Sequence, residues 1–482
     1  MPSARHVVVQ ALKIVWVFSV FYFELWTFYR HAGSCDWPAP RQERADDAEH
    51  VLLVADPQIL DMRSYPGRHP ALQWLSQVIV DLNLRKNWRA ALRSHPDKIV
   101  FLGDMLDNGR MDMTDEEYSA YHRRFRRVFQ GSGTTPTFYI PGNHDIGLGE
   151  PSAYSRSAQA DERYVAHFGE PNKVVHAGGH ALVMIDAPRL VDEDRERISL
   201  GRTFDEWSFP PNGTMSFAKS IPRDLDEAVP RVLLTHIPLH RPPKSGCGPL
   251  RERGTIRAGH GGGYENTISR EASQMLLEAI KPTFVFSGDD HDYCEYTHHY
   301  SGRTAQEITV KSLSMAMGVR RPGYQLLSLA PAHRGSDDAA AAAATTLCLL
   351  PDQLHIYLGI YVPLLVLSLA LIGAVNALAR HRRRSSFSSD GTWRTEDALP
   401  APALLTSGRR PTRLTRQRSS PGPGRNPPSY AAPLKRVLKT ALTSSRPGRQ
   451  RSLTRDILYD VRDVAILPLL LFSLITWWTM AY

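Results

Sequence analysis

Cysteine is scarce in this sequence: four of 482 residues are cysteines, at positions 35, 247, 294 and 348. So few cysteines exclude a small scaffold held together by disulfides, and no two have the C-x-x-C spacing of a zinc ribbon. Cys247 and Cys294 could pair in an oxidising compartment, and two unpaired structural thiols are an equal alternative. No internal repeat is apparent.

An excess of positive charge is also absent from most of the chain, although the net charge is +9. Residues 380–463 hold 19 Lys/Arg and 6 Asp/Glu, so the rest of the chain has a net charge of −4. Because the basic character belongs to one segment, nucleic acid is not expected as a partner. A hydrophobic content of 42% with 22% charged residues is ordinary for a chain with a packed core.

Three apolar stretches predict membrane-spanning helices. Residues 354–378 contain no Asp, Glu, Lys or Arg, and residues 464–482 include the pair Trp477-Trp478, which suits a membrane interface. Each is long enough to cross about 30 Å of hydrocarbon. The first stretch, within residues 1–30, is expected to be an N-terminal anchor. A cleaved signal peptide is the alternative, because Ala32-Gly33-Ser34 resembles a cleavage site.

Residues 380–462 separate the last two stretches and are rich in Ser, Pro and Arg. This composition predicts a disordered linker. Positive charge beside membrane spans stays in the cytosol, which places residues 30–350 in a lumen or at the cell exterior. The sequon Asn212-Gly213-Thr214 is compatible with the lumen of the endoplasmic reticulum. The alanine run at residues 339–344 is expected to be a spacer before the second span.

Short apolar strands alternate with helical patterns in the lumenal portion. Residues 115–129 and 269–281 have helical patterns, and "ITVKSLSM" and "YQLLSLA" are expected to form later, antiparallel strands. This alternation predicts an α/β (α+β) domain at residues 45–335, with a sheet covered by helices. The other predicted strands are residues 50–56, 98–104, 137–145, 180–186, 231–236 and 283–290.

Five of these strands end in residues that can bind metal ions. In an α/β sheet, ligands bind beyond the carboxyl ends of the strands, so the five clusters are expected to converge. Oxygen donors mixed with imidazole suit a pair of divalent metal ions. The clusters are Asp56-x-Gln58, Gly103-Asp104-x-x-Asp107, Gly142-Asn143-His144-Asp145, His236 and Gly288-Asp289-Asp290-His291.

In this order the clusters resemble the calcineurin-like metallophosphoesterases, whose pattern is D-x-H, G-D-x-x-D, G-N-H-D/E, H and G-H-x-H. The resemblance covers roughly residues 50–330. It implies a four-layer αββα sandwich and a two-metal centre that hydrolyses phosphoric esters. It also implies that Asp104 bridges the two ions. The remaining implied ligands are Asp56, Gln58 and His291 for one ion, and Asn143, His236 and Asp289 for the other.

Two positions depart from the family pattern, because Gln58 and Asp289 stand where histidines are usual. Amide and carboxylate oxygens are harder ligands than imidazole, which favours manganese or magnesium over zinc or iron. Mn²⁺ is the expected ion. Gln58 either binds the metal directly or accepts a hydrogen bond from metal-bound water. His144, oriented by Asp145, is expected to donate a proton to the leaving group.

The motifs "ADPQIL", "GDMLDNGR" and "SGDDHDYCE", flanked by membrane spans, resemble fungal proteins related to the GPI-anchor remodelling phosphoesterase. This resemblance implies removal of ethanolamine phosphate from a mannose of the GPI glycan, with GPI-anchored proteins or GPI lipid as partners. The implied location is the membrane of the endoplasmic reticulum. Alternatives are a phosphoesterase or pyrophosphatase acting on dolichyl phosphates or nucleotides, and a non-catalytic scaffold that recruits cargo. His298 and His299 are expected to be solvated surface residues.

Overall fold

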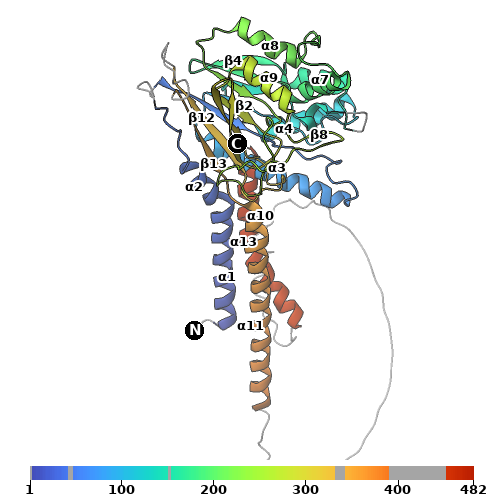
Figure 1. The fold of residues 1–482 in the computed structure, drawn as a ribbon. Coiled ribbons are helices and arrows are strands. Elements are labelled where there is room, and N and C mark those ends of the chain that lie inside the picture. The colour runs from blue at the N-terminus through green and yellow to red at the C-terminus, as the bar shows by residue number, and fades with distance from the viewer. Residues whose placement is uncertain (1–2, 42–46, 150–153, 332–341, 390–451, 482) are drawn as a thin grey trace, which may run out of the picture. The chain divides into compact units, whose positions relative to one another are not determined.

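The structure is a computed structural model that describes residues 3–41, 47–149, 154–331, 342–389 and 452–481 (Figure 1). The chain forms two compact units. One consists of the described residues within 1–11 and 368–463, and the other of the described residues within 12–367 and 464–482. Both large sheets and all predicted site residues belong to the second unit.

Two mixed sheets form the centre of the second unit. The first has the strand order β13-β12-β1-β2-β3 and the second has the order β10-β11-β9-β6-β5-β4. The first sheet contains β1 (Glu49–Val54), β2 (Lys98–Phe101), β3 (Thr137–Tyr139), β12 (Gly323–Leu329) and β13 (Ala343–Leu349). The second contains β4 (Lys173–Ala177), β5 (His180–Met184), β6 (Arg231–Leu234), β9 (Phe284–Ser287), β10 (Cys294–Tyr300) and β11 (Arg303–Thr309). The short hairpin β7 (His260–Gly261) and β8 (Tyr264–Glu265) stands apart.

Helices cover the outer face of each sheet, which confirms the predicted four-layer sandwich. Along β1, Val51 and Leu53 pack in the core between the sheets, whereas Leu52 and Val54 pack in the core against the helices. Because both faces of the strand are buried, its sequence is a continuous apolar run rather than an alternating one. The first sheet is covered by α3 (Pro70–Leu92), α4 (Asp115–Val128) and α6 (Ala158–Phe168), the second by α7 (Ala187–Ser199), α8 (Thr214–Asp224) and α9 (Arg270–Ile280).

Helix α4 shows how local sequence sets these helices. The N-cap Thr114 accepts a hydrogen bond from the Glu117 N–H at 3.2 Å. Acidic residues fill the first turn and Arg126 and Arg127 the last, which complements the helix dipole. Tyr118, Tyr121, Phe125 and Val128 are buried along one face. The predicted helix at residues 115–129 is therefore confirmed.

Three sequence predictions about the end of the domain are wrong. Ala343 and Ala344 do not belong to a spacer, because they begin β13, which pairs with β12 in antiparallel register; residues 339–341 lie outside the described residues. The first sheet therefore extends past residue 335. In "ITVKSLSM", only the first two residues are in a strand, and β11 is parallel to β9 as well as antiparallel to β10.

Three helical segments are long and apolar enough to cross a membrane, at Ala4–Gly33, Gln353–Arg384 and Leu453–Ala481. The first consists of α1 (Ala4–Phe21), the π-helix η1 (Tyr22–Trp26) and α2 (Thr27–Gly33), and the third is α13 (Leu453–Ala481). The second consists of α10 (Gln353–His355), the π-helix η3 (Ile356–Tyr361) and the start of α11 (Val362–Ser389). The prediction of disorder from Arg380 to Arg462 is wrong at both ends, which are helical. Residues 390–451 lie outside the described residues.

All four cysteines form disulfides. Cys247 pairs with Cys294, the pairing that the sequence left open. Cys35 pairs with Cys348, across a sequence separation of 313 residues. The second bridge joins the chain after α2 to the last strand of the first sheet, so it ties the first candidate span to the folded domain.

Candidate metal centre

The predicted ligands follow the ends of five strands, three in the first sheet and two in the second. Asp56 comes two residues after β1 and Asp104 three after β2, while His236 and Asp289 each come two residues after β6 and β9. Asn143 is the first residue of the short helix α5 (Asn143–Ile146), which follows β3. The pairs β1–β2, β2–β3 and β6–β9 are parallel, so their carboxyl ends meet at the same edges. The predicted convergence is therefore observed.

Five of the predicted ligands have an unusual backbone conformation. Their φ angles lie between 39° and 66°, in the left-handed region that side chains disfavour. Such conformations cost about 1–3 kcal/mol each and persist where the surrounding structure holds them for function. Only ten non-glycine residues of the described chain have a positive φ, so half of them are at this site. The five are Asp56, Gln58, Asp104, Asp289 and His291.

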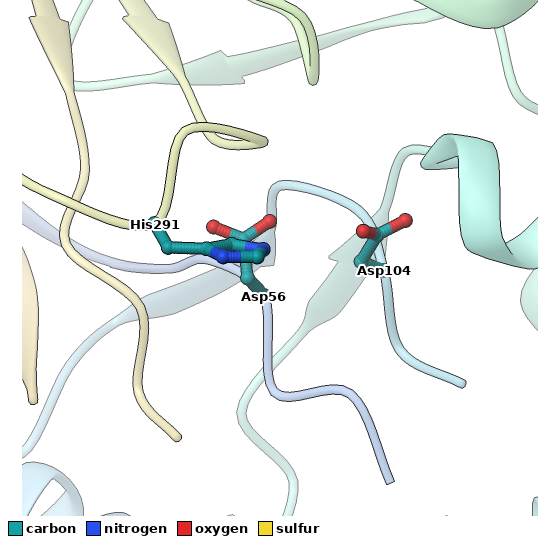
Figure 2. A group of neighbouring side chains, drawn as sticks. All are labelled: Asp56, Asp104 and His291. Atoms are coloured by element: carbon teal, nitrogen blue, oxygen red, sulfur yellow. The ribbon is translucent and has the colours of Figure 1, made fainter. Parts of the chain in front are cut away.

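One half of the site is formed by Asp56, Asp104 and His291, whose ligand atoms all lie within 4.8 Å of one another (Figure 2). Nearby, Gln58 Nε2 donates a hydrogen bond to Asp104 Oδ2 at 2.8 Å. This leaves Gln58 Oε1 buried and without a hydrogen-bond partner among the described residues, as is Asp56 Oδ2. Buried acceptor atoms without donors are costly unless a cation binds them.

The other half is formed around His236. Its Nδ1 lies 2.7 Å from the Leu102 carbonyl oxygen, so Nδ1–H donates there and Nε2 faces the centre of the site. Three oxygens surround Nε2, from Asn143 Oδ1 at 3.1 Å, Asp104 Oδ1 at 3.4 Å and Asp289 Oδ1 at 3.6 Å. Acceptors that face one another in this way repel unless a cation lies between them. This donor set fits a divalent metal ion.

The charges of the site lead to the same conclusion. Burial, followed by the nearby Asp104 carboxylate, raises the pKa of both Asp56 and Asp289 well above the usual range. Burial also raises that of Asp104, but the His236 and His144 rings outweigh it, and the net pKa of Asp104 is lowered. Burial lowers the pKa of His291 to about 4, so at neutral pH its ring is uncharged, the form that binds metals. Carboxylates crowded in this way are stabilised by cations.

Glycines make this close packing possible. A Cβ atom at Gly142 would overlap the carboxylate of Asp104, and one at Gly103 would overlap the ring of His236. Gly103 also has a φ of 99°, which disfavours any other residue. The glycines of "GD" and "GNHD" are therefore required because the ligands approach the backbone.

The side chains of residues 289–292, after β9, have two different surroundings. Asp289 and His291 contribute to the site, whereas Asp290 and Asp292 form ion pairs elsewhere. Asp290 lies 2.5 Å from Arg251 Nη1, and Asp292 lies 2.8 Å from Lys311 Nζ. Only part of the negative charge therefore needs a metal ion for compensation.

The predicted pairing of His144 with Asp145 is wrong. The Asp145 carboxylate is buried and accepts hydrogen bonds from the N–H groups of Gly142, Met105 and Leu106, at 3.0, 3.3 and 3.0 Å. It therefore fixes the two ligand loops. The His144 ring is instead held by Asp107, whose backbone oxygen lies 2.6 Å from His144 Nδ1.

Two parts of the site were not assigned from the sequence. Asp107 was included in a motif but given no role, and the hairpin β7–β8 was not recognised. The Gly263 carbonyl in this hairpin accepts from Asn143 Nδ2 at 2.7 Å and from Arg110 Nη1 at 3.3 Å. This turns the Asn143 amide oxygen toward His236. The only sequence signal was the glycine run at residues 261–263.

His298 is also misassigned by the sequence reading. It is buried, and its Nε2 lies 2.6 Å from the carboxylate of Glu307, which also lies 2.9 Å from Arg241. His298 therefore belongs to a buried polar cluster of the second sheet, while His299 is exposed as expected. The missed signal was the position of His298 in the strand β10, where every second side chain points inward.

The fold and this site together define a class of protein. The chain belongs to the calcineurin-like phosphoesterase family, whose pattern residues 50–293 match. It is a metal-dependent phosphoric ester hydrolase, of a family that uses a pair of divalent metal ions.

Individual relatives agree with this class. The chain is 36% identical to cell division control protein 1 of Saccharomyces cerevisiae over 356 residues, which cover 70% of this chain and 68% of the relative. It is 27% identical to metallophosphoesterase 1 of Ailuropoda melanoleuca over 65% of this chain and 79% of the relative. It is 25% identical to the metallophosphoesterase 1 homolog of Drosophila melanogaster over 62% of this chain and 77% of the relative.

Proposed function

We propose that this hydrolase is a membrane-anchored phosphodiesterase that removes ethanolamine phosphate from a mannose of the GPI-anchor glycan, which allows GPI-anchored proteins to leave the endoplasmic reticulum. The observation that carries the proposal is a phosphoesterase site with a group of side chains that could hold a metal ion, in a chain with three helices long enough to cross a membrane. A tethered active site meets lipid-linked substrates at high effective concentration. The motifs "GDMLDNGR" and "SGDDHDYCE" supply the resemblance that specifies the glycan.

The metal assignment follows the donor set. In this proposal Asp104 would be shared by two ions; Asp56, Gln58 and His291 would hold one, and Asn143, His236 and Asp289 would hold the other. The unpaired Gln58 Oε1 supports a direct ligand role for this residue. Five of the seven ligands offer oxygen, which supports Mn²⁺ as the ion.

The reaction needs an activated nucleophile, compensation of the negative charge on the phosphoryl oxygens, and a protonated leaving group. When bound, a pair of divalent ions activates water and neutralises the phosphoryl oxygens. His144 supplies the proton. Its Nδ1–H is held by the Asp107 carbonyl, so Nε2 is left for the leaving oxygen. Burial disfavours the charged ring, but Asp104 and Asp107 outweigh burial and raise the pKa of His144, which keeps the proton available near neutral pH.

The proposed location is the membrane of the early secretory pathway, with the sandwich in the lumen. Both disulfides support an oxidising compartment. Asn212 of the sequon is exposed, at the end of a loop before α8, which supports glycosylation. The basic segment 380–463 supports a cytosolic position for the linker.

Mass spectrometry of GPI glycans tests the substrate. Cells that lack the protein are expected to accumulate glycans with one additional ethanolamine phosphate, and the wild-type chain is expected to remove it, whereas a chain with Asp104→Asn is not. Unchanged glycans, with turnover of dolichyl phosphates or nucleotides by the purified protein, would favour the alternative substrates. A chain that binds metal but cleaves no phosphoester would be the cargo-recruiting scaffold.

A further inference from the structure

In the N-terminal half of helix α3, large apolar side chains face the solvent instead of the core. Its solvent face carries four large apolar side chains: Leu72 is 56% exposed, Trp74 62%, Leu75 43% and Val78 40%. At 100° per residue these positions form one continuous stripe. Met62, on the segment before the helix, is exposed as well. We call the four α3 residues and Met62 the apolar face.

Two polar contacts of α3 with the rest of the domain fix this orientation. Gln73 is 2% exposed, and its Nε2 donates to the Asp61 carbonyl at 2.9 Å. Asp81 is buried and accepts hydrogen bonds from Arg124 Nε and Nη2 at 2.5 and 2.7 Å. Turning the helix to bury its apolar side chains would break these bonds. The exposure of the apolar face is therefore built into the domain.

The other half of α3 contacts the end of a candidate membrane span. Arg85 Nε donates to the Thr479 carbonyl and Arg89 Nη1 to the Trp478 carbonyl, both at 3.0 Å. The Arg89 guanidinium also stacks 3.7 Å from the centre of a Trp478 ring. These arginines cap the last turns of α13, whose final carbonyls have no partners within the helix. The end of a membrane span lies at the bilayer surface, so the C-terminal half of α3 lies there as well.

The apolar face continues from this anchor. Figure 1 shows α3 running crosswise to the last turns of α13, on the side of the sheets where α10 also lies. With a rise of about 1.5 Å per residue, Trp74 lies about 22 Å along the helix from Arg89. A helix that is anchored at the bilayer surface by its C-terminal half and exposes Trp, Leu and Val along its N-terminal half has the properties of an interfacial helix.

We propose that the apolar face of α3 rests in the boundary between head groups and acyl chains of the bilayer that the spanning helices cross. Met62 lies six residues after Asp56, so one short segment joins this contact to the first ligand loop. The contact thereby sets the height of the metal centre above the lipid phosphates. This holds for any membrane-linked substrate and does not depend on the proposed glycan.

Lipid quenching tests the proposal directly. The full chain with Leu75→Cys or Val78→Cys, labelled with an environment-sensitive fluorophore, is reconstituted in phosphatidylcholine nanodiscs. Ile198→Cys is the matched control, because Ile198 on α7 is 54% exposed and belongs to the other face of the sandwich. Spin-labelled lipid is expected to quench labels at residues 75 and 78 but not at 198, and aqueous iodide is expected to do the reverse.

Two results would overturn the proposal. If iodide quenches the labels at residues 75 and 78 as strongly as the label at 198, the apolar face is open to water. If neither quencher reaches these labels, a protein surface covers the face, either a second copy or another segment of the chain. Neither readout requires catalysis, so failure here leaves the proposed phosphodiesterase activity untouched, and failure of that activity leaves this contact untouched.

Discussion

At the scale of single residues, Asp104 connects both halves of the site. One of its oxygens accepts from Gln58, while the other lies 3.4 Å from His236 and accepts from the His144 N–H at 2.9 Å. Replacement by asparagine removes the negative charge that the proposed assignment shares between two cations. We expect Asp104→Asn to lower the turnover of an aryl phosphodiester by about 10²–10³-fold. Asp290→Asn is the matched control, because Asp290 pairs with Arg251, and it should retain most activity; equal losses would contradict the ligand assignment.

His144 is predicted to act on the proton and not on the metal. His144→Ala is therefore expected to keep the metal content of the wild type while losing about 10²–10⁴-fold in rate. Steady-state kinetics and elemental analysis of the same preparation check both statements. Loss of bound metal in this variant would contradict the role assigned to His144.

Sequence reasoning located the ligands but not the residues that hold them in place. The motifs name Asp56, Asp104, His236 and His291 because strand ends converge in this fold class. They do not show that Asp107, rather than the adjacent Asp145, holds the His144 ring. That choice depends on loop conformation, in which a few φ angles decide where each carboxylate points, and no periodic pattern encodes it.

At the scale of elements, a buried ion pair joins the first candidate span to the domain. Glu24 of η1 pairs with Lys86 of α3, and both are buried. Tyr361 also donates to Glu24 at 2.9 Å. Removing one partner leaves an uncompensated buried charge, so Glu24→Gln is expected to cost about 3–5 kcal/mol of stability. Thermal unfolding in detergent measures this loss.

An exposed ion pair is the control for this prediction. Glu227 pairs with Lys281 at 2.6 Å on the surface, where solvent screens the charges, so Glu227→Gln is expected to cost far less stability than Glu24→Gln. The double variant Glu24→Gln/Lys86→Met should regain much of the stability lost by Glu24→Gln. If Glu24→Gln is no less stable than Glu227→Gln, the buried pair does not tie the span to the domain.

His122 on α4 contacts the rings of His167 and Phe168 on α6, and this contact makes stability depend on pH. Burial, with the nearby His167 and Arg126, lowers the pKa of His122 from 6.5 to about 4. Between these values the unfolded chain binds more protons than the folded chain, so this contribution is present above pH 6.5 and is lost on acidification toward pH 4. We expect this loss in the free energy of unfolding to be about 1–2 kcal/mol, after allowance for solvent screening of the half-buried ring. Unfolding of His122→Gln should show a weaker loss between pH 7 and 5; an unchanged profile would refute this origin.

At the scale of the whole molecule, the apolar runs predicted a sheet covered by helices and the three apolar segments, while the four layers of the sandwich were implied by the family resemblance. It did not predict that Cys35 and Cys348 pair, since nothing local relates residues 313 positions apart. It also placed the end of the domain too early, because the alanines of β13 have low strand propensity and are held by pairing with β12. Long-range pairing overrides local composition at both places.

The central claim is that the converging carboxylates, imidazoles and amides hold two divalent ions. Elemental analysis of the purified full-length protein after incubation with manganese and removal of free metal tests it most directly. The account predicts two manganese ions per chain in the wild type and in Asp290→Asn, and fewer in Asp104→Asn. A wild-type chain that retains no metal would contradict the account.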